Sequence, residues 1–257
     1  MVWWDVCVRH SHMLDVQKLC KTFGALKVVR DLSLHIPRGA RHALIGPNGA
    51  GKTTFFNLLT GDIKVDSGTI KLSGADLTHA RPDFRARLGM ARSFQKNNLF
   101  SDLTVTQNLV TALVVARGYG RRIWKRLSGM GELTADAERL GELIGLAEVL
   151  HEPARALAYG MQRQLEVGLA LAVDPKLLLL DEPTAGMSPD ETQLMLSLIG
   201  KLPPSLTLVI IEHDMDVVFQ FAERITVLDA GGVLFEGSPN EVRNSQIVRA
   251  RYLKIPV

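Results

Sequence analysis

The sequence predicts an α/β fold with a mainly parallel sheet, on two observations. Residues 177–180 are all apolar and residues 206–211 are apolar except for Thr207, as is typical of strands buried on both faces of a parallel sheet. Segments of helical length lie between and after these runs, and such alternation of strand with helix is typical of a parallel sheet covered by helices. The 257 residues are enough for one large domain or for a core with one inserted subdomain.

The other elements follow from hydrophobic periodicity and from the positions of glycine and proline. Residues 32–36 alternate apolar and polar side chains, which indicates a half-buried strand, and residues 37–39 make a turn. Residues 41–45 form a short strand that leads into a glycine-rich loop, and Gly61 stands where a helix C-cap is expected. We expect further strands at 68–72, 89–94, 177–180, 206–211, 224–228 and 233–236, a mostly helical stretch at 104–150, and helices at 53–60, 135–146, 162–173, 190–202 and 215–222.

Composition and charge are those of an ordinary globular protein and do not indicate nucleic-acid binding. Apolar residues make up 46% of the chain and charged residues 22%, with a net charge of +3. No apolar run reaches the ~20 residues of a membrane helix, and residues 1–12 resemble an extension ahead of the domain. Cys7 and Cys20 fit a reduced compartment, and Cys20 is expected in a core strand. The densest basic cluster, interpreted as a solvated loop or helix end, is Arg117, Arg121, Arg122, Lys125 and Arg126.

Residues 46–53, Gly-Pro-Asn-Gly-Ala-Gly-Lys-Thr, match the P-loop (Walker A) pattern G-x-x-x-x-G-K-[ST]. Glycines let the backbone curl so that successive N–H groups point at phosphate oxygens, and the following helix adds its positive N-terminal dipole. Lys52 supplies a cation for the β- and γ-phosphates, and the Thr53 hydroxyl can ligate Mg²⁺. The alternative is a glycine-rich turn that happens to contain a lysine, but the strand before the loop and the helix after it favour the P-loop. The expected ATP-binding residues are Gly46, Pro47, Asn48, Gly49, Ala50, Gly51, Lys52, Thr53 and Thr54.

An acidic pair, Asp181 and Glu182, directly follows the apolar run 177–180. A carboxylate at the tip of a buried parallel strand, beside a P-loop strand, suits a second Mg²⁺ contact, which is the role expected of Asp181. Glu182 is expected to orient and deprotonate the attacking water. Acidic residues also cap helices, and the residues alone leave that alternative open, although the intact P-loop favours catalysis.

Three further segments resemble motifs of the ATP-binding cassette (ABC) ATPases. Residues 157–163, Leu-Ala-Tyr-Gly-Met-Gln-Arg, resemble the ABC signature, residues 211–214, Ile-Glu-His-Asp, resemble the switch histidine, and residues 92–95, Arg-Ser-Phe-Gln, resemble the Q-loop. The motifs occur in the family's order, so the resemblance covers nearly the whole chain. It implies a P-loop NTPase core with a mainly parallel sheet, an antiparallel β subdomain and an inserted helical subdomain. The expected domains are an extension at 1–12, the ATP-binding core at 13–95 and 166–245, the helical subdomain at 96–165 and a tail at 246–257.

The resemblance also implies roles for single residues. ATP would lie between the P-loop of one subunit and the signature of a partner, whose helix, expected to begin at Gln162, has a positive N-terminus. Gln95 would contact Mg²⁺ or the attacking water, His213 would bond the γ-phosphate, and Phe23 would stack on adenine. A plain loop amide and a core aromatic are the alternatives for Gln95 and Phe23. The implied catalytic residues are Glu182, His213 and Lys52. The implied metal ligands are Thr53, Gln95 and Asp181. The implied signature residues are Ala158, Tyr159, Gly160 and Met161. The remaining histidines, His10, His12, His35, His42, His79 and His151, are expected at the surface.

Three positions depart from the general family pattern. Ala158 replaces the usual signature serine, Met161 replaces glutamine, and Ser188 stands where the D-loop usually has aspartate. A degenerate site and a distinct subfamily would both explain these changes. The subfamily is favoured, because residues 157–160 and 185–192 resemble the ATPase subunits of branched-chain amino-acid importers and of related urea and amide importers.

The sequence therefore predicts the ATP-binding and ATP-hydrolysing subunit of an ABC importer, with ATP and Mg²⁺ as cofactors. The predicted partners are a second ATPase subunit in a head-to-tail homo- or heterodimer, membrane permeases and, indirectly, a substrate-binding protein. The predicted location is peripheral, on the cytoplasmic face of the inner membrane. At the C-terminus Arg251 and Lys254 depart from the subfamily's usual Ala-Tyr-Leu-Gly. The alternatives are another ABC system (urea or amide import, or export), a soluble ABC ATPase acting on DNA or ribosomes, and a module that binds nucleotide without turnover.

Overall fold

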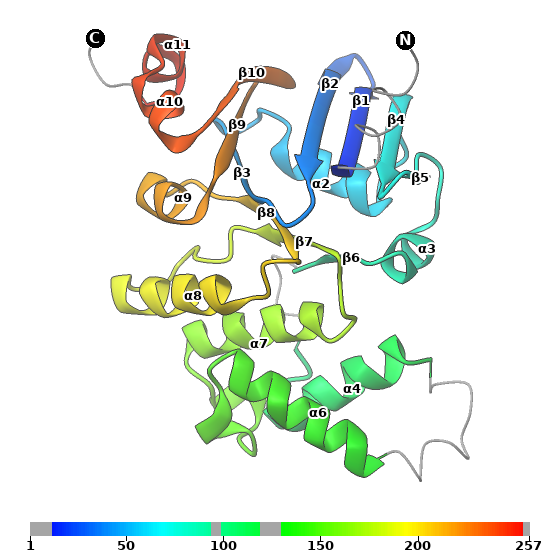
Figure 1. Ribbon diagram of the computed structural model, residues 1–257, viewed down its shortest axis with the longest axis vertical. Coiled ribbons are helices and arrows are strands. Elements are labelled where there is room, and N and C mark those ends of the chain that lie inside the picture. The colour runs from blue at the N-terminus through cyan, green and yellow to red at the C-terminus, as the bar shows by residue number, and fades with distance from the viewer. Residues whose placement is uncertain (1–11, 94–98, 119–129, 254–257) are drawn as a thin grey trace. The chain divides into compact units, whose positions relative to one another are not determined.

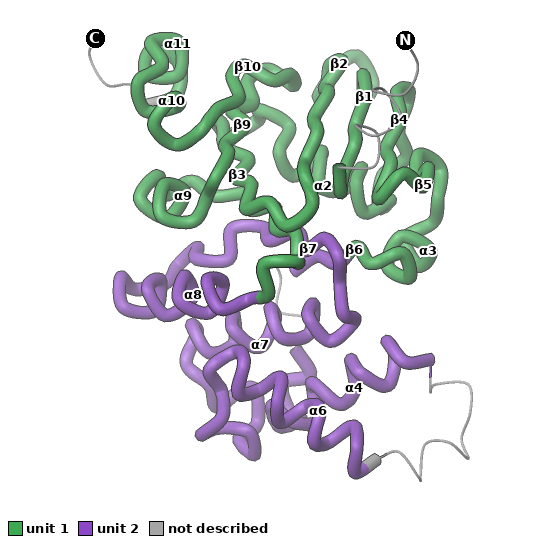
Figure 2. Tube along the Cα trace, viewed as in Figure 1, with its two compact units in different colours: residues 1–90, 203–257 green, residues 91–202 purple. Residues whose placement is uncertain are grey.

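The computed structural model of the chain describes residues 12–93, 99–118 and 130–253 (Figure 1). The chain divides into two compact units, residues 1–90 with 203–257 and residues 91–202 (Figure 2). Both units combine strands with helices, and the predicted α/β class is confirmed. Within the described ranges no helix has the length and apolar character needed to cross a membrane. The expected core, helical subdomain, extension and tail remain predictions.

The first unit contains a four-stranded antiparallel sheet with the order β2-β1-β4-β5. Its inward-facing apolar side chains, such as Leu14, Leu34 and Ile70, are fully buried. Cys20 lies in this sheet, but it is half-buried and does not belong to the core. The strands are β1 (His12–Phe23), β2 (Leu26–Pro37), β4 (Ser67–Leu72) and β5 (Ala75–Asp76).

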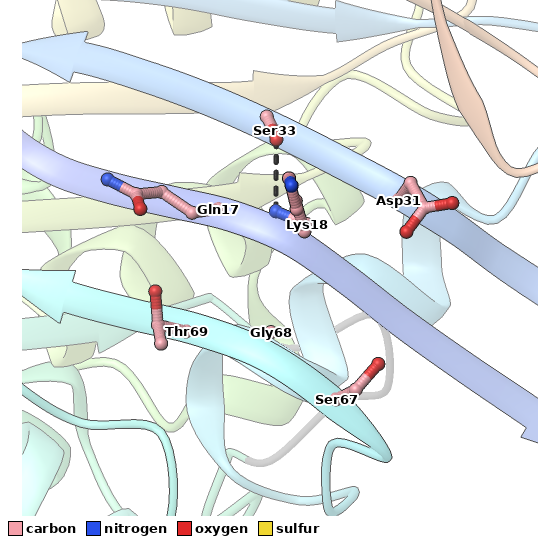
Figure 3. Close-up of a pocket in the computed structure, with 7 residues that line it drawn as sticks. All are labelled: Gln17, Lys18, Asp31, Ser33, Ser67, Gly68 and Thr69. Atoms are coloured by element: carbon pink, nitrogen blue, oxygen red, sulfur yellow. Dashed lines mark hydrogen bonds between the residues drawn. The ribbon is translucent and has the colours of Figure 1, made fainter.

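A bulge in β1 shapes the exposed face of this sheet. The pairing of β1 with β2 shifts register between Val16 and Leu19, and Lys18 there has a φ of +48°. The Lys18 N–H donates to Ser33 Oγ at 2.9 Å, and a Cβ on Gly68 would lie 2.4 Å from the Lys18 carbonyl oxygen, so only glycine fits (Figure 3). The side chains around the bulge form a polar hollow lined by Gln17, Lys18, Asp31, Ser33, Ser67, Gly68 and Thr69. No residue of the nucleotide-site motifs lines this hollow, so we assign it no role in the site.

The same unit holds the strands β10, β9, β3 and β8, neighbours in that order. β3 is parallel to both β8 and β9, and β10 is antiparallel to β9. Leu44 lies opposite Ile211, and Ile45 lies opposite Val227, so the segments that follow these three parallel strands leave from one edge of the sheet. The strands are β3 (Arg41–Ile45), β8 (Thr207–Ile211), β9 (Arg224–Asp229) and β10 (Gly232–Gly237). The helices are α2 (Lys52–Thr60), α3 (Pro82–Arg87), α9 (Met215–Phe221), α10 (Pro239–Asn244), α11 (Gln246–Val248) and a final helical turn, η4 (Arg249–Leu253).

His42 is fully buried in β3, so the prediction that it lies at the surface is wrong. β3 is an inner strand that pairs on both sides, and its residues from His42 to Ile45 are all buried. His42 Nε2 lies 2.8 Å from Thr226 Oγ1 on the neighbouring β9, which gives the buried ring a polar partner. Of the other histidines, His10 lies outside the described residues, His12 is half-buried, and His35, His79 and His151 are exposed as predicted.

The second unit packs helices together with the neighbouring strands β6 and β7. All of β7 is buried, as its apolar run predicts. Helix α6 packs on α4 and α7, and α7 also packs on α8 (Figure 1). The strands are β6 (Met90–Arg92) and β7 (Leu177–Asp181); the helices are α4 (Val105–Ala116), α6 (Met130–Leu143), α7 (Tyr159–Leu171) and α8 (Pro189–Lys201), with short turns η2 (Ala147–Val149) and η3 (Ala154–Ala156).

Candidate nucleotide site

The phosphate-binding loop, residues 46–53, joins β3 to α2 in the first unit. Gly46 has a φ of +149°, and a Cβ there would lie 2.2 Å from the Leu228 carbonyl oxygen, so only glycine fits at the start of the loop. The Ala50 N–H donates to the Pro47 carbonyl at 3.1 Å and closes a turn. Gly51 caps α2 with a φ of +96° and without a side-chain hydrogen bond. The first N–H groups of α2 therefore have no capping side chain, which suits binding of an anion.

Lys52 is buried inside this loop. Its Nζ donates to the carbonyl oxygens of Gly46 at 2.6 Å and Pro47 at 3.0 Å, which holds the ammonium group across the loop. Thr53 is exposed and Thr54 half-buried at the start of α2. A fixed cation, curled backbone N–H groups and a helix N-terminus fit the phosphates of a nucleotide.

The segment with the predicted switch histidine leaves the same edge of the sheet. His213 follows β8 by two residues, and Gly46 follows Leu44, the β3 residue opposite Ile211, by two residues. The His213 ring is exposed, whereas Glu212 is buried and its Oε2 accepts the backbone N–H of His213 at 3.2 Å. The pairing of β3 with β8 therefore brings the histidine and the phosphate-binding loop to the same edge of the sheet.

Phe23 ends β1 and is 46% exposed, which excludes a core role for its ring. It pairs with Leu26 across the turn to β2, and two residues further along β2 the Val28 carbonyl lies against Gly51 of the phosphate-binding loop. The Lys21 ammonium lies 5.4 Å from the centre of the Phe23 ring. The ring is thus accessible, on a hairpin that contacts the loop.

The acidic pair lies at the end of β7 in the second unit. Asp181 is 2% exposed, and its Oδ2 forms an ion pair with Arg92 Nη2 at 2.6 Å. The Asp181 N–H donates to Ser93 Oγ at 3.4 Å. Glu182 is half-buried with a φ of +49°, in the left-handed region that non-glycine residues adopt mainly at turns and functional sites. Sequence reasoning gave Arg92 no role, and nothing in its local pattern indicates the pairing.

The signature segment forms the first turn of α7, which begins at Tyr159 and not at the predicted Gln162. The Gly160 N–H donates to Glu191 Oε1 of α8 at 3.1 Å. The Tyr159 hydroxyl donates to the Ala185 carbonyl at 3.0 Å and accepts the Arg163 Nε–H at 3.0 Å. Ala158 and Met161 are exposed beside this turn. The signature is therefore tied to both the loop before α8 and α8 itself.

Ser188 and Glu191 form a capping box at the start of α8. Ser188 Oγ accepts the Glu191 N–H at 3.3 Å, and Glu191 Oε2 accepts the Ser188 N–H at 2.9 Å. The serine at this unusual D-loop position thus caps a helix. Sequence reasoning missed Glu191, although a serine followed three residues later by glutamate is the signal of such a box.

Some predicted residues lie outside the part of the chain that the structure describes. They include Gln95, the predicted Q-loop residue, together with Cys7 and most of the basic cluster. The other predicted site residues fall in two sets. The first unit holds the phosphate-binding loop, Phe23 and His213, and the second unit holds Asp181, Glu182 and the signature.

A P-loop at the carboxyl end of a parallel strand, with an acidic strand end and a signature helix in the same chain, defines an ATP-binding P-loop ATPase. The chain belongs to the ABC transporter family, because the family profile described as "ABC transporter" matches residues 29–185. The predictions of the family, of its fold and of an ATPase are confirmed.

Curated relatives and solved structures match over almost the whole chain. The chain is 39% identical over 248 residues to the high-affinity branched-chain amino acid transport ATP-binding protein LivG of Salmonella typhimurium, with 94% of this chain and 97% of the relative covered. It is 35% identical over 249 residues to the corresponding protein BraF of Pseudomonas aeruginosa, with the same coverage of 94% and 97%. A solved ATP-binding cassette of an ABC transporter matches with a TM-score of 0.83 at 27% identity, covering 94% of this chain and 98% of that chain. The ADP conformation of that cassette gives a TM-score of 0.81 at 27% identity, covering 95% and 99%.

Proposed function

We propose that this chain hydrolyses ATP to power the import of branched-chain or related amino acids. The support is the similarity to LivG and BraF, both named for branched-chain amino acid transport, over 97% of their lengths. The observation that carries the nucleotide chemistry is the phosphate-binding loop, in which the Lys52 ammonium is held by two loop carbonyls. The substrate passes through other subunits, so its class rests on the relatives.

The proposed reaction gives each site residue one task. The loop N–H groups and Lys52 bind the phosphates of ATP, and the exposed Phe23 ring stacks on adenine. Glu182 takes the proton of the attacking water. His213 bonds the γ-phosphoryl group as negative charge develops on its oxygens.

Mg²⁺ is the proposed metal, and when bound it neutralises charge on the phosphates. Mg²⁺ usually binds one or two protein oxygens together with substrate phosphates and water. The exposed Thr53 hydroxyl at the start of α2 and the Asp181 carboxylate at the end of β7 are oxygen ligands of this kind. Gln95 is proposed as a further contact.

The proposed assembly adds a second ATPase subunit, membrane permeases and a substrate-binding protein to this chain. A second ATPase subunit, identical or different, would pair head to tail, so that the first turn of α7 in one subunit faces the γ-phosphate bound by the other. Membrane permeases would carry the amino acid, and a substrate-binding protein would deliver it to them. The chain would act at the cytoplasmic face of the inner membrane.

Purification with its partners tests the transport role. The tagged chain is isolated from its own membranes in mild detergent, and the proteins that accompany it are identified by mass spectrometry. Two multi-span permeases and a second ATPase are the expected companions. Recovery of ribosomes or DNA-repair factors without membrane proteins would contradict transport, and permeases of an exporter or of a urea or amide system would contradict the amino-acid assignment.

Replacement of the loop lysine tests the nucleotide site separately. Lys52→Ala removes the cation that the loop carbonyls hold, so nucleotide affinity should fall by at least about tenfold, the loss typical of a charged hydrogen-bonding partner. Lys64→Ala is the control, because Lys64 is exposed in the same unit and outside the motif. Titration with a fluorescent ATP analogue measures both variants, and equal affinities would refute the assigned site.

A further inference from the structure

The last residues of β1 lie beyond its pairing with β4. β1 lies between β2 and β4, and the pairing of β1 with β4 ends at Cys20 and Ser67 (Figure 1). On the other side of β1, its pairing with β2 shifts register between Lys21 and Thr22. Phe23, which ends the strand, is 46% exposed. Neither regular pairing nor burial in the core therefore fixes the position of the Phe23 ring.

The carboxylate of Asp66 holds this end of the strand. Asp66 directly precedes β4, and its Oδ1 forms an ion pair with the Lys21 ammonium at 2.7 Å. Its Oδ2 accepts the Thr22 N–H at 2.7 Å, and its own backbone N–H donates to the Cys20 carbonyl at 3.1 Å. Asp66 thus binds three consecutive residues of β1, the last of which precedes Phe23.

These partners keep Asp66 ionised at neutral pH. The hydrogen bond from Lys21, and secondarily that from the Thr22 N–H, lowers the pKa of Asp66. The Asp66 side chain is 42% exposed, whereas that of Lys21 is only 13% exposed. A lysine with a largely buried stem has few positions for its ammonium group, and the charge of Asp66 selects one of them.

The Lys21 ammonium in turn faces the aromatic ring. Its Nζ lies over the Phe23 ring, 5.4 Å from the ring centre, within the range of a cation–π interaction. This attraction requires the ring to present its face to the cation, so it fixes the tilt of the ring as well as its place. The contacts therefore connect Asp66 through Lys21 to Phe23.

We propose that Asp66 is a positioning residue for the base of the nucleotide: by holding the Lys21 ammonium and the Thr22 backbone, it fixes the Phe23 ring where the ring stacks on adenine. The inference rests on the proposed stacking role of Phe23. Asp66 lies outside every ATPase motif of the sequence, and the pairing of β1 with β4 brings it to the end of β1.

Asp66→Asn in the full chain, with ATP and inorganic tripolyphosphate as ligands, tests this proposal. Asparagine offers one acceptor oxygen where the carboxylate offers two, and it has no charge for Lys21. The dissociation constant for ATP should rise about three- to fivefold, the upper range for an exposed ion pair. Tripolyphosphate has no base to stack, so its affinity should stay parental. Displacement of a fluorescent ATP analogue measures both ligands in each variant.

The effect of Asp66→Asn should depend on the Phe23 ring. Phe23→Ala should weaken ATP at least about fivefold, as expected for the loss of stacking on one base, and should also leave tripolyphosphate unchanged. Adding Asp66→Asn to Phe23→Ala should then cost no further ATP affinity, because the two residues act through one ring. Asp83→Asn is the matched control, since it removes an exposed ion pair to Arg87 in the same unit and should bind both ligands like the parent.

The two ligands separate this proposal from a purely structural role of Asp66. The hairpin of β1 and β2 contacts the phosphate-binding loop through the Val28 carbonyl and Gly51, so its general loosening would weaken both ligands. Equal weakening of ATP and tripolyphosphate in Asp66→Asn would therefore overturn the proposal. Parental ATP affinity in Asp66→Asn would also overturn it when Phe23→Ala has lost affinity. Parental ATP affinity in Phe23→Ala would refute the stacking role itself, and this inference with it.

Discussion

His42 must stay uncharged at the centre of the parallel strands. Its Nε2 lies 2.8 Å from Thr226 Oγ1, and its Nδ1 is buried with no hydrogen-bond partner among the residues that the structure describes. Burial, and secondarily the positive charge of Arg224 on the neighbouring strand, lowers the pKa of His42 from 6.5 to about 4. Between these two pH values the unfolded chain binds a proton that the folded chain does not.

Stability should therefore fall as the pH drops from 6.5 towards 4, with a contribution from His42 of up to about 3 kcal/mol. His42→Gln retains a donor for Thr226 but cannot titrate, so this part of the pH dependence should disappear. The free energy of unfolding, measured by urea titration at several pH values in this range, compares the variant with the parent. His151→Gln, at an exposed position, should keep the parental slope. Identical slopes in parent and His42→Gln would contradict the buried neutral ring.

Single residues could be predicted from sequence where the chemistry is local. The phosphate-binding loop is an example, because the tight approach at Gly46 and the reach of Lys52 depend on a few consecutive residues. The burial of His42 and the pairing of Arg92 with Asp181 depend on strands brought together from distant parts of the chain. No local pattern carries that information, so these two features could be found only in the structure.

Helices α7 and α8 are joined by Glu191, which serves both of them. Its carboxylate accepts the N–H of Ser188 at the start of α8 and the N–H of Gly160 in the signature turn. These bonds, with Ser188 as the larger cause and Gly160 as a smaller one, lower the pKa of Glu191. The start of α8 thus fixes the turn that is proposed to face the partner's nucleotide.

Glu191→Gln should uncouple these two helix starts, because an amide offers one carbonyl oxygen where the carboxylate offers two. Turnover of the assembled ATPase should fall several-fold, whereas nucleotide affinity of the isolated chain should not change, since the phosphate-binding loop belongs to the other unit. Steady-state hydrolysis and analogue binding measure the two effects. Glu148→Gln, an exposed position in the same unit, is the control. Unchanged turnover in Glu191→Gln would remove Glu191 from the signature's support.

Some elements can be predicted well from the sequence and others only poorly, and the physical reasons can be identified. The apolar run of β7 predicts its strand well, because all of its residues are buried. The sequence pattern places only Cys20 in a strand and does not define β1, because the bulge at Lys18 interrupts the alternation of apolar and polar residues. The sequence pattern predicts a start of α7 three residues later than the observed Tyr159, because Ala158 at its N-cap makes no side-chain hydrogen bond and is not a typical capping residue.

At the scale of the whole molecule, the two sets of ATPase motifs belong to different compact units. The phosphate-binding loop and His213 lie in the first unit, and Glu182 and the signature lie in the second. In the proposed head-to-tail dimer the signature of one subunit serves the nucleotide of the other. Binding of ATP can then precede hydrolysis, because binding depends on the loop while hydrolysis depends on the assembled dimer.

Glu182→Gln separates these two steps. The amide cannot take a proton from water, so hydrolysis should fall at least about 100-fold, while the loop still binds ATP. Uncleaved ATP should then keep subunits together, and light scattering with ATP and Mg²⁺ should show a dimer that the parent forms only briefly. Glu148→Gln, the exposed control, should turn over and dissociate like the parent. Parental hydrolysis in Glu182→Gln would assign the general base to another residue. An inactive, ATP-bound variant that stays monomeric would contradict the shared site.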